Sequence, residues 1–139
     1  MNEPTRRRHG GAPFEYTILV VEDEAPIRIL MWDILERAGY RVHVATDACD
    51  ALRKIAEIGK LDLLVTDLSM PGMTGLQLAR HALEIIPELA VIYATGSQEC
   101  FPETRADITC LTKPFTREEL LGAIDASLNL HLNPQVGPQ

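Results

Sequence analysis

The chain lacks the features that define several large protein classes. None of its apolar runs approaches the roughly 20 residues that a membrane-spanning helix needs, and Met1 to Tyr16 contain no apolar core of a secretory signal. It also lacks a basic excess, because its net charge is −7. Phosphate affinity comes mainly from clustered lysine and arginine. The sequence therefore predicts a cytoplasmic protein that binds neither membranes nor nucleic acid.

Cysteine pairs are also missing. Cys49, Cys100 and Cys110 are three, an odd number, and they form no CxxC motif. This pattern suits a reducing cytosol and gives no disulfide framework and no zinc site. We expect Cys110 to be a small buried apolar residue, with a redox-sensitive thiol as the alternative.

Length and composition indicate one folded domain. A chain of 139 residues, 46% of them apolar, can bury a core of its own. Residues 1–15 hold Arg6 to Arg8, two glycines and two prolines, and we expect them to form a flexible tail. Residues 131–139 are expected to be a second flexible tail, which leaves residues 16–130 as the domain.

Strand and helix patterns alternate along that domain. Short apolar runs predict strands over 17–21, 41–45, 61–66, 90–94 and 109–112. The first, third and fourth runs are nearly continuous, as in strands of a parallel sheet buried on both faces. The fold class predicted is a doubly wound α/β domain, with a five-stranded parallel sheet in the order 2-1-3-4-5. In that order ligands bind at the carboxyl ends of the strands.

Helical periodicity fills the segments between the strands. It predicts one helix from Pro26 to Ala38, a second that begins after Asp47 as its cap, and a third over 75–86. A further helix should begin after Thr116, with Glu119 completing a capping box. The helix over 97–107 should be short. The stripe expected to be buried in the first helix comprises Ile27, Leu30, Met31, Ile34, Leu35 and Ala38. Trp32 lies off this stripe beside Ile29, so it either folds over the helix edge or forms a partner-docking patch.

Five polar residues stand at or just past the ends of the predicted strands: Glu22, Asp23, Asp67, Thr95 and Lys113. Carboxylates brought together there raise one another's pKa unless a cation lies between them. Oxygen ligands of this kind suit Mg2+. A carboxylate can also accept a phosphoryl group, while a lysine and a hydroxyl neutralise and bind its oxygens. The sequence therefore predicts a phosphorylation site at this edge of the sheet.

The segments ILVVEDEAPIRIL, LLVTDLSMPGMTG, YATG and LTKPF occur in this order. Together they resemble the receiver domain of two-component response regulators, over almost the whole chain. The resemblance implies that Asp67 is the phosphoacceptor and that Asp23, Asp67 and the Ser69 carbonyl bind Mg2+, with Glu22 acting through water. It also implies that Thr95 and Lys113 bind the phosphoryl group and that the Lys113–Pro114 peptide is cis.

Two departures from the family pattern concern signal output. The family usually has Tyr or Phe as a rotating switch residue three positions before the lysine, where this chain has Cys110. The stretch from Thr95 to Lys113 is also shorter than in many receivers. No output domain follows Leu130, so the expected protein is a single-domain response regulator. Its donor would be a histidine kinase or a phosphotransfer protein, and its output protein is unknown.

Two other functions fit parts of the pattern. A receiver-like adaptor would act without phosphorylation, although the complete acidic pocket argues against this. A phosphohydrolase of the haloacid-dehalogenase type would use Asp67 as its nucleophile. That family places a second acid two residues later, where this chain has Ser69.

Overall fold

The computed structural model of the protein describes residues 16–96 and 108–132. The expected N-terminal tail and the predicted short helix over 97–107 lie outside the described residues. The expected C-terminal tail begins within the last helix, which continues to Leu132.

All strands of the sheet run parallel. They are β1 (Thr17–Val21), β2 (Arg41–Ala45), β3 (Leu63–Asp67), β4 (Ala90–Thr95) and β5 (Ile108–Thr112), in the order β2-β1-β3-β4-β5. The predicted fold class is confirmed. The third strand begins two residues later than predicted and ends one residue later, at Asp67. Just before it, the Asp62 carboxylate accepts a hydrogen bond from the Thr17 N–H at the start of β1.

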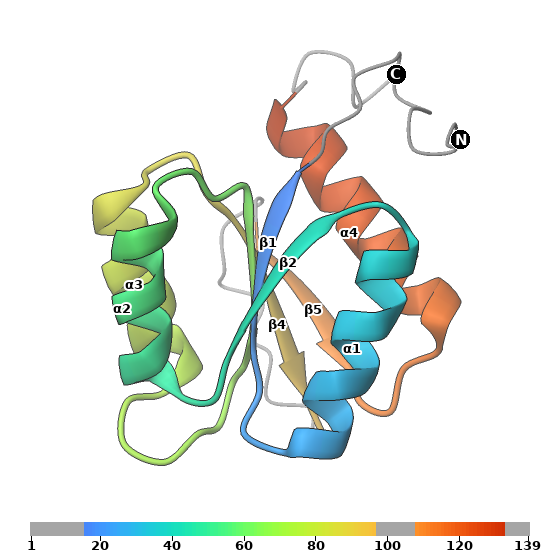
Figure 1. The fold of residues 1–139 in the computed structure, drawn as a ribbon, viewed down its shortest axis with the longest axis horizontal. Coiled ribbons are helices and arrows are strands. Elements are labelled where there is room, and N and C mark those ends of the chain that lie inside the picture. Colours follow the sequence, from blue (N-terminus) through green and yellow to red (C-terminus); the bar gives the residue numbers. More distant parts are fainter. Residues whose placement is uncertain (1–15, 97–107, 133–139) are drawn as a thin grey trace.

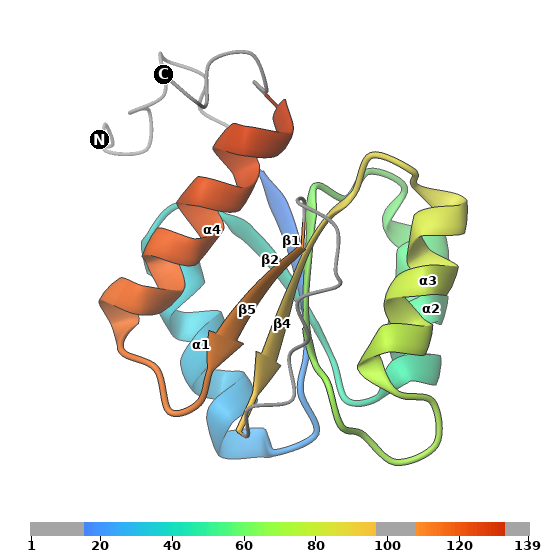
Figure 2. The same cartoon turned by 180° about the vertical axis from the view of Figure 1, so that it is seen from behind.

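The helices cover both faces of the sheet. They are α1 (Ala25–Arg37), α2 (Ala48–Ile58), α3 (Gly75–Ile85) and α4 (Arg117–Leu132). Figure 1 shows α2 and α3 together on one face, with α1 and α4 on the other, and Figure 2 shows the same layers from behind. Successive strand residues point to opposite faces. Leu19 and Leu64 therefore pack toward α2 and α3, while Val20 and Val65 pack toward α1 and α4.

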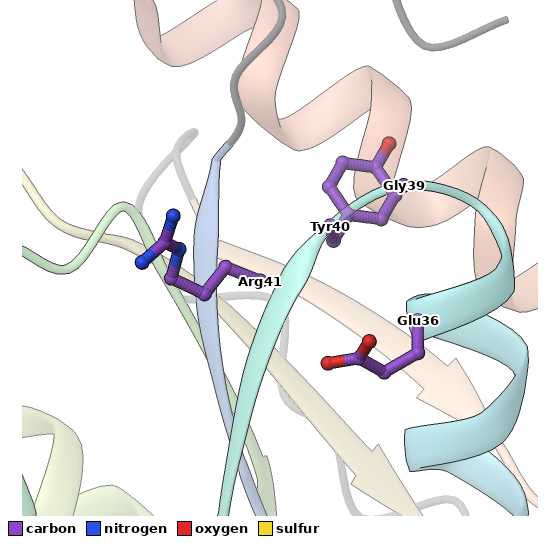
Figure 3. Close-up of a pocket in the computed structure, with 4 residues that line it drawn as sticks. All are labelled: Glu36, Gly39, Tyr40 and Arg41. Atoms are coloured by element: carbon purple, nitrogen blue, oxygen red, sulfur yellow. The ribbon is translucent and has the colours of Figure 1, made fainter. Parts of the chain in front are cut away.

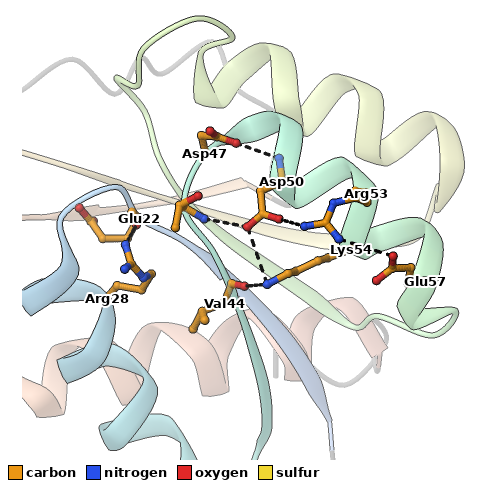
Figure 4. A network of polar contacts seen from close by, with 9 residues as sticks. Glu22, Arg28, Val44, Asp47, Asp50, Arg53, Lys54 and Glu57 are labelled. Atoms are coloured by element: carbon orange, nitrogen blue, oxygen red, sulfur yellow. Dashed lines mark hydrogen bonds and ion pairs between the residues drawn. The ribbon is translucent and has the colours of Figure 1, made fainter.

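Side-chain caps set several helix ends. The Asp47 carboxylate accepts the Asp50 N–H at the start of α2. At the start of α4, Thr116 and Glu119 each bond the other's backbone N–H, so the predicted capping box is confirmed. Figure 4 shows Lys54 of α2 donating to the Val44 carbonyl at the sheet edge.

The expected burial of α1 is wrong at one position. Met31, Ile34 and Leu35 are buried as predicted, but Leu30 is 56% exposed. The buried stripe follows residues three and four apart along the helix, and Leu30 lies at its margin beside solvent. Ile29 and Trp32 are also exposed, by 61% and 41%. Within residues 16–96 and 108–132, no helix is long and apolar enough to span a membrane.

Candidate functional site

The acidic residues meet at the carboxyl ends of β1 and β3. Ligand oxygens of Glu22, Asp23 and Asp67 all lie within 4.8 Å of one another. The strands β1 and β3 are neighbours and Val21 pairs with Thr66, so the residues that follow them emerge side by side. One cation could contact oxygens from all of these residues. Hard oxygen donors at this spacing suit Mg2+, so the chain's residues fit the ion that the sequence predicts.

Lys113 reaches the acidic cluster from the end of β5. Its Nζ lies 2.8 Å from Glu22 Oε1 and 3.3 Å from Asp67 Oδ2. Because β4 separates β5 from β3, the side chain extends across the sheet edge to make these contacts. The Lys113 N–H donates to the Thr95 carbonyl at 2.8 Å, which fixes the base of the side chain. The Lys113–Pro114 peptide is cis, as the resemblance implies.

Glu22 is the buried member of the cluster and is only 1% exposed. Its carboxylate bonds Lys113 through Oε1 and accepts the Glu24 N–H through Oε2, at 3.1 Å. A charge buried this deeply is costly unless it is paired and hydrogen-bonded. Both carboxylate oxygens of Glu22 thus have a protein partner that offsets this cost. The Asp23 side chain, by contrast, is exposed and accessible to an incoming ion.

Burial raises the pKa of Asp67, while the nearby Lys113 charge lowers it and offsets only part of this effect. The pKa of Lys113 is also raised: its burial opposes this, and the hydrogen bond and charge of Glu22 outweigh the burial. The pKa values of both partners are raised because Glu22, at the shorter distance, is the main partner of Lys113. The backbone N–H of Ser69 also acts to lower the pKa of Asp67.

Thr95 ends β4 and is 4% exposed. In the sheet, Ala94 is the register partner of Asp67, and Thr95 is that of Thr112. Thr95 therefore stands between the ends of β3 and β5, where the sequence places it. The structure brings together Glu22, Asp23, Asp67, Ser69, Thr95 and Lys113.

The loop after Asp67 returns tightly onto it. Gly72 has a φ of 79°, which favours glycine, and the Gly75 N–H donates to the Leu68 carbonyl at 2.9 Å. A Cβ on Gly75 would lie 2.2 Å from the Asp67 carbonyl oxygen. Glycine at this position therefore permits the start of α3 to touch the backbone of Asp67.

The structure contradicts the expectation for Cys110. Its side chain is exposed, whereas the neighbouring Leu111 is buried against the face that α1 and α4 cover. Strand residues alternate between faces, and β5 is an edge strand, so Cys110 points away from that core. Cys110 is also disulfide-bonded, so the expectation of no disulfide is wrong, while Cys49 is a free, exposed thiol.

A separate hollow of about 250 Å3 lies at the other end of the sheet. Figure 3 shows its lining of Glu36, Gly39, Tyr40 and Arg41, at the turn from α1 into the start of β2. The acidic cluster lies at the carboxyl ends of the strands, so this hollow is not part of it.

One polar contact was not foreseen from the sequence. The Arg28 Nη1 donates to the Glu22 carbonyl at 2.9 Å. From sequence alone, an arginine in the early turns of a helix is normally interpreted as a solvated surface charge. No spacing rule predicts that it bonds a carbonyl six residues earlier.

A parallel sheet in this order, with an acidic cluster and a lysine at its carboxyl edge, defines a receiver-type α/β domain. Residues 18–125 match the family of the response regulator receiver domain, and the chain belongs to that family. It is 36% identical over 115 residues to the response regulator receiver protein CpdR of Brucella abortus, covering 80% of this chain and 95% of that protein. With the DNA-binding transcriptional regulator NtrC of Azospirillum brasilense it shares 31% identity over 126 residues, which make up only 26% of that protein.

Solved receiver structures agree with the fold. A response regulator receiver protein from Sinorhizobium medicae superposes with a TM-score of 0.76 at 30% identity, covering 84% of this chain and 97% of that one. The response regulator TrrA of Thermotoga maritima, solved in complex with Mg2+ and BeF, gives a TM-score of 0.72 at 30% identity, covering 81% and 99%.

The contact between Gly75 and Asp67 yields a stability prediction. Gly75→Ala should destabilise the protein by about 1–3 kcal/mol, because the new methyl group must displace backbone atoms. Gly122→Ala on α4 is the control, since a Cβ there meets nothing within 4 Å. It should stabilise the helix by about 0.5–1 kcal/mol. Urea unfolding measures both. Equal stability of Gly75→Ala and wild type would show that the loop relaxes freely.

The raised pKa of Asp67 predicts a pH-dependent stability without metal. Above its folded pKa the partly buried Asp67 carboxylate is charged and destabilises the fold. Below the ordinary pKa of an aspartate, about 3.9, it is protonated in both the folded and the unfolded state, and this cost is absent. Asp67→Asn should therefore be more stable than wild type at pH 7. The advantage should shrink as the pH falls through that window. Unfolding curves of both proteins across pH 3–7 test this, and an advantage independent of pH would contradict it.

Proposed function

We propose that this protein is a phosphorylation switch that accepts a phosphoryl group on Asp67 from a histidine kinase or a phosphotransfer protein. The observation that carries the proposal is the position of the Asp67 carboxylate. One of its oxygens lies within 4.8 Å of carboxylate oxygens of Glu22 and Asp23, and its Oδ2 lies 3.3 Å from the Lys113 ammonium. Membership of the receiver family supports the same function.

The reaction joins an Asp67 oxygen to the phosphorus of the donor. As that bond forms, the bond between phosphorus and the donor's imidazole nitrogen breaks, and the nitrogen keeps the electron pair. The product is an acyl phosphate on Asp67 and a free histidine on the donor. Phosphoryl transfer depends mainly on in-line positioning and on neutralising charge at the oxygens.

Each residue of the site would have a separate role in binding the metal ion or the phosphoryl group. Bound Mg2+ would supply positive charge to the phosphoryl oxygens, held by Asp23, Asp67 and the Ser69 carbonyl. Lys113 would move part of its interaction from Glu22 and Asp67 to a phosphoryl oxygen, and the Thr95 hydroxyl would donate to another. Glu22, already held by two protein partners, would act on the ion through water.

The surface next to the site suits a protein donor. The helix α1 begins two residues after Asp23, and its apolar side chains Ile29, Leu30 and Trp32 are exposed. A donor that brings a histidine into contact with Asp67 must also cover the elements around it. Burying these side chains would favour that encounter. The output partner would recognise the same domain after phosphorylation has shifted its conformational equilibrium.

Phosphorylation of Asp67 is tested with acetyl phosphate as a small donor. With Mg2+, wild type should gain the mass of one phosphoryl group, and Asp67→Asn should gain none. Asp33→Asn is the control, since Asp33 lies on α1 in an exposed pair with Arg37, and it should be labelled like wild type. Chelation of Mg2+ should abolish labelling. Equal labelling of wild type and Asp67→Asn would refute the acceptor, and no labelling of wild type would favour an unphosphorylated adaptor.

The metal assignment makes an ordered prediction. Asp23→Ala should weaken Mg2+ binding more than Glu22→Ala does, because Asp23 is exposed to the ion while Glu22 is engaged by Lys113 and the Glu24 N–H. Calorimetric titration of the unphosphorylated proteins measures both affinities. Asp23→Ala can gain stability without metal, because it removes a repelling charge, whereas Glu22→Ala also removes the buried partner of Lys113. A larger loss of affinity in Glu22→Ala would reverse the assignment.

A further inference from the structure

Asp23 lies in the turn between β1 and α1, and an arginine side chain bonds the carbonyl of the residue before it. The Arg28 Nη1 donates to the Glu22 carbonyl at 2.9 Å, and Figure 4 shows this contact between the two residues. Arg28 itself is half-buried, and its backbone N–H bonds the Glu24 carbonyl in the first turn of α1. The side chain therefore reaches back from the helix to the residue that precedes Asp23.

Glu22 is the last residue that the sheet holds on this side. Its N–H donates to the Ala45 carbonyl at 3.1 Å, while β1 itself ends at Val21. Its carboxylate is held by Lys113 and by the Glu24 N–H. The carbonyl is the remaining polar group of Glu22, and Arg28 occupies it.

This carbonyl lies in the peptide plane that joins Glu22 to Asp23. A peptide unit is planar, so fixing its oxygen also fixes the direction in which the Asp23 N–H and Cα leave the strand. That direction decides where the exposed Asp23 carboxylate can place its oxygens relative to Asp67. A guanidinium is suited to this task because its donors have a fixed planar geometry and it stays charged at all relevant pH values.

We propose that Arg28 is a positioning residue of the metal site: it holds the Glu22–Asp23 peptide so that the Asp23 carboxylate faces Asp67. The inference rests on the proposed function, since it concerns the same site. Arg28 bonds a carbonyl and not a carboxylate, so ion binding does not require this contact to break. Lys113 differs in this respect, because it contacts two carboxylates of the cluster. The positive charge of Arg28 also lies beside the acidic residues without competing for their oxygens.

A simpler role for Arg28 would be to tie α1 to β1. Both roles predict some loss of stability when the side chain is removed, so unfolding alone does not separate them. Only the positioning role predicts weaker metal binding in a protein that is still folded. Residues that orient metal ligands typically change affinity by about 10–100-fold when they are replaced.

The test compares wild type with Arg28→Met, which keeps the apolar stem but removes the donors. Arg37→Met is the matched control, because Arg37 lies on the same helix and pairs with Asp33 on the surface. Mg2+ binding to the unphosphorylated proteins is measured by calorimetry, and amide hydrogen exchange of Asp23 and Glu24 is measured without metal. Arg28→Met should bind Mg2+ about 10-fold more weakly and exchange these amides faster. Arg37→Met should match wild type, and Arg28→Lys should lie between Arg28→Met and wild type.

Wild-type Mg2+ affinity in folded Arg28→Met would overturn the proposal and leave only the structural tie. If Arg28→Met does not fold, Arg28→Gln, whose neutral amide is too short to reach the carbonyl, carries the same expectations. Failure of the proposed function looks different. In that case wild type itself neither binds Mg2+ nor accepts a phosphoryl group from acetyl phosphate. If wild type does both and Arg28→Met matches it, only the role of Arg28 falls.

Discussion

The ion pairs of Lys113 with Glu22 and Asp67 are the interaction on which the rest of this site depends. Three carboxylates crowd the carboxyl ends of β1 and β3, and one of them is almost fully buried. Without a cation their mutual repulsion would oppose folding. Lys113 supplies that positive charge from within the chain. It reaches the cluster because β5 is parallel to the other strands, so its carboxyl end lies at the same edge of the sheet as the ends of β1 and β3. The fold thus tolerates an acidic site whether or not a metal is bound.

The backbone around the cluster is held as firmly as the side chains. Gly75 touches the Asp67 carbonyl, the Lys113 N–H bonds the Thr95 carbonyl, and Arg28 bonds the Glu22 carbonyl. Each contact joins segments from different elements. Chemistry on a phosphoryl group depends on placing reacting oxygens accurately, and contacts that hold the main chain around the site favour that accuracy.

Much of the fold follows from local patterns. Continuous apolar runs identify β1, β3 and β4 because parallel strands are buried on both faces, and the caps at Asp47 and Thr116 mark real helix starts. Periodicity is less informative at the margin of a stripe, where Leu30 proves exposed. Periodicity also does not predict the exposure of Cys110, because a small side chain shows no clear preference for either face of a strand. Only the arrangement of the helices shows which face of β5 is covered.

The sequence by itself determined the family and the residues that gather at the site, since each follows a strand whose parallel pairing brings its end to one edge. It could not determine how those residues share their charges. Only the tertiary structure decided that Glu22 is buried and engaged on both oxygens, that it is the main partner of Lys113, and that Arg28 bonds its carbonyl. These facts depend on distances between groups far apart in the chain. Coulomb and hydrogen-bond energies change steeply over such short distances, and no residue spacing in the sequence encodes them.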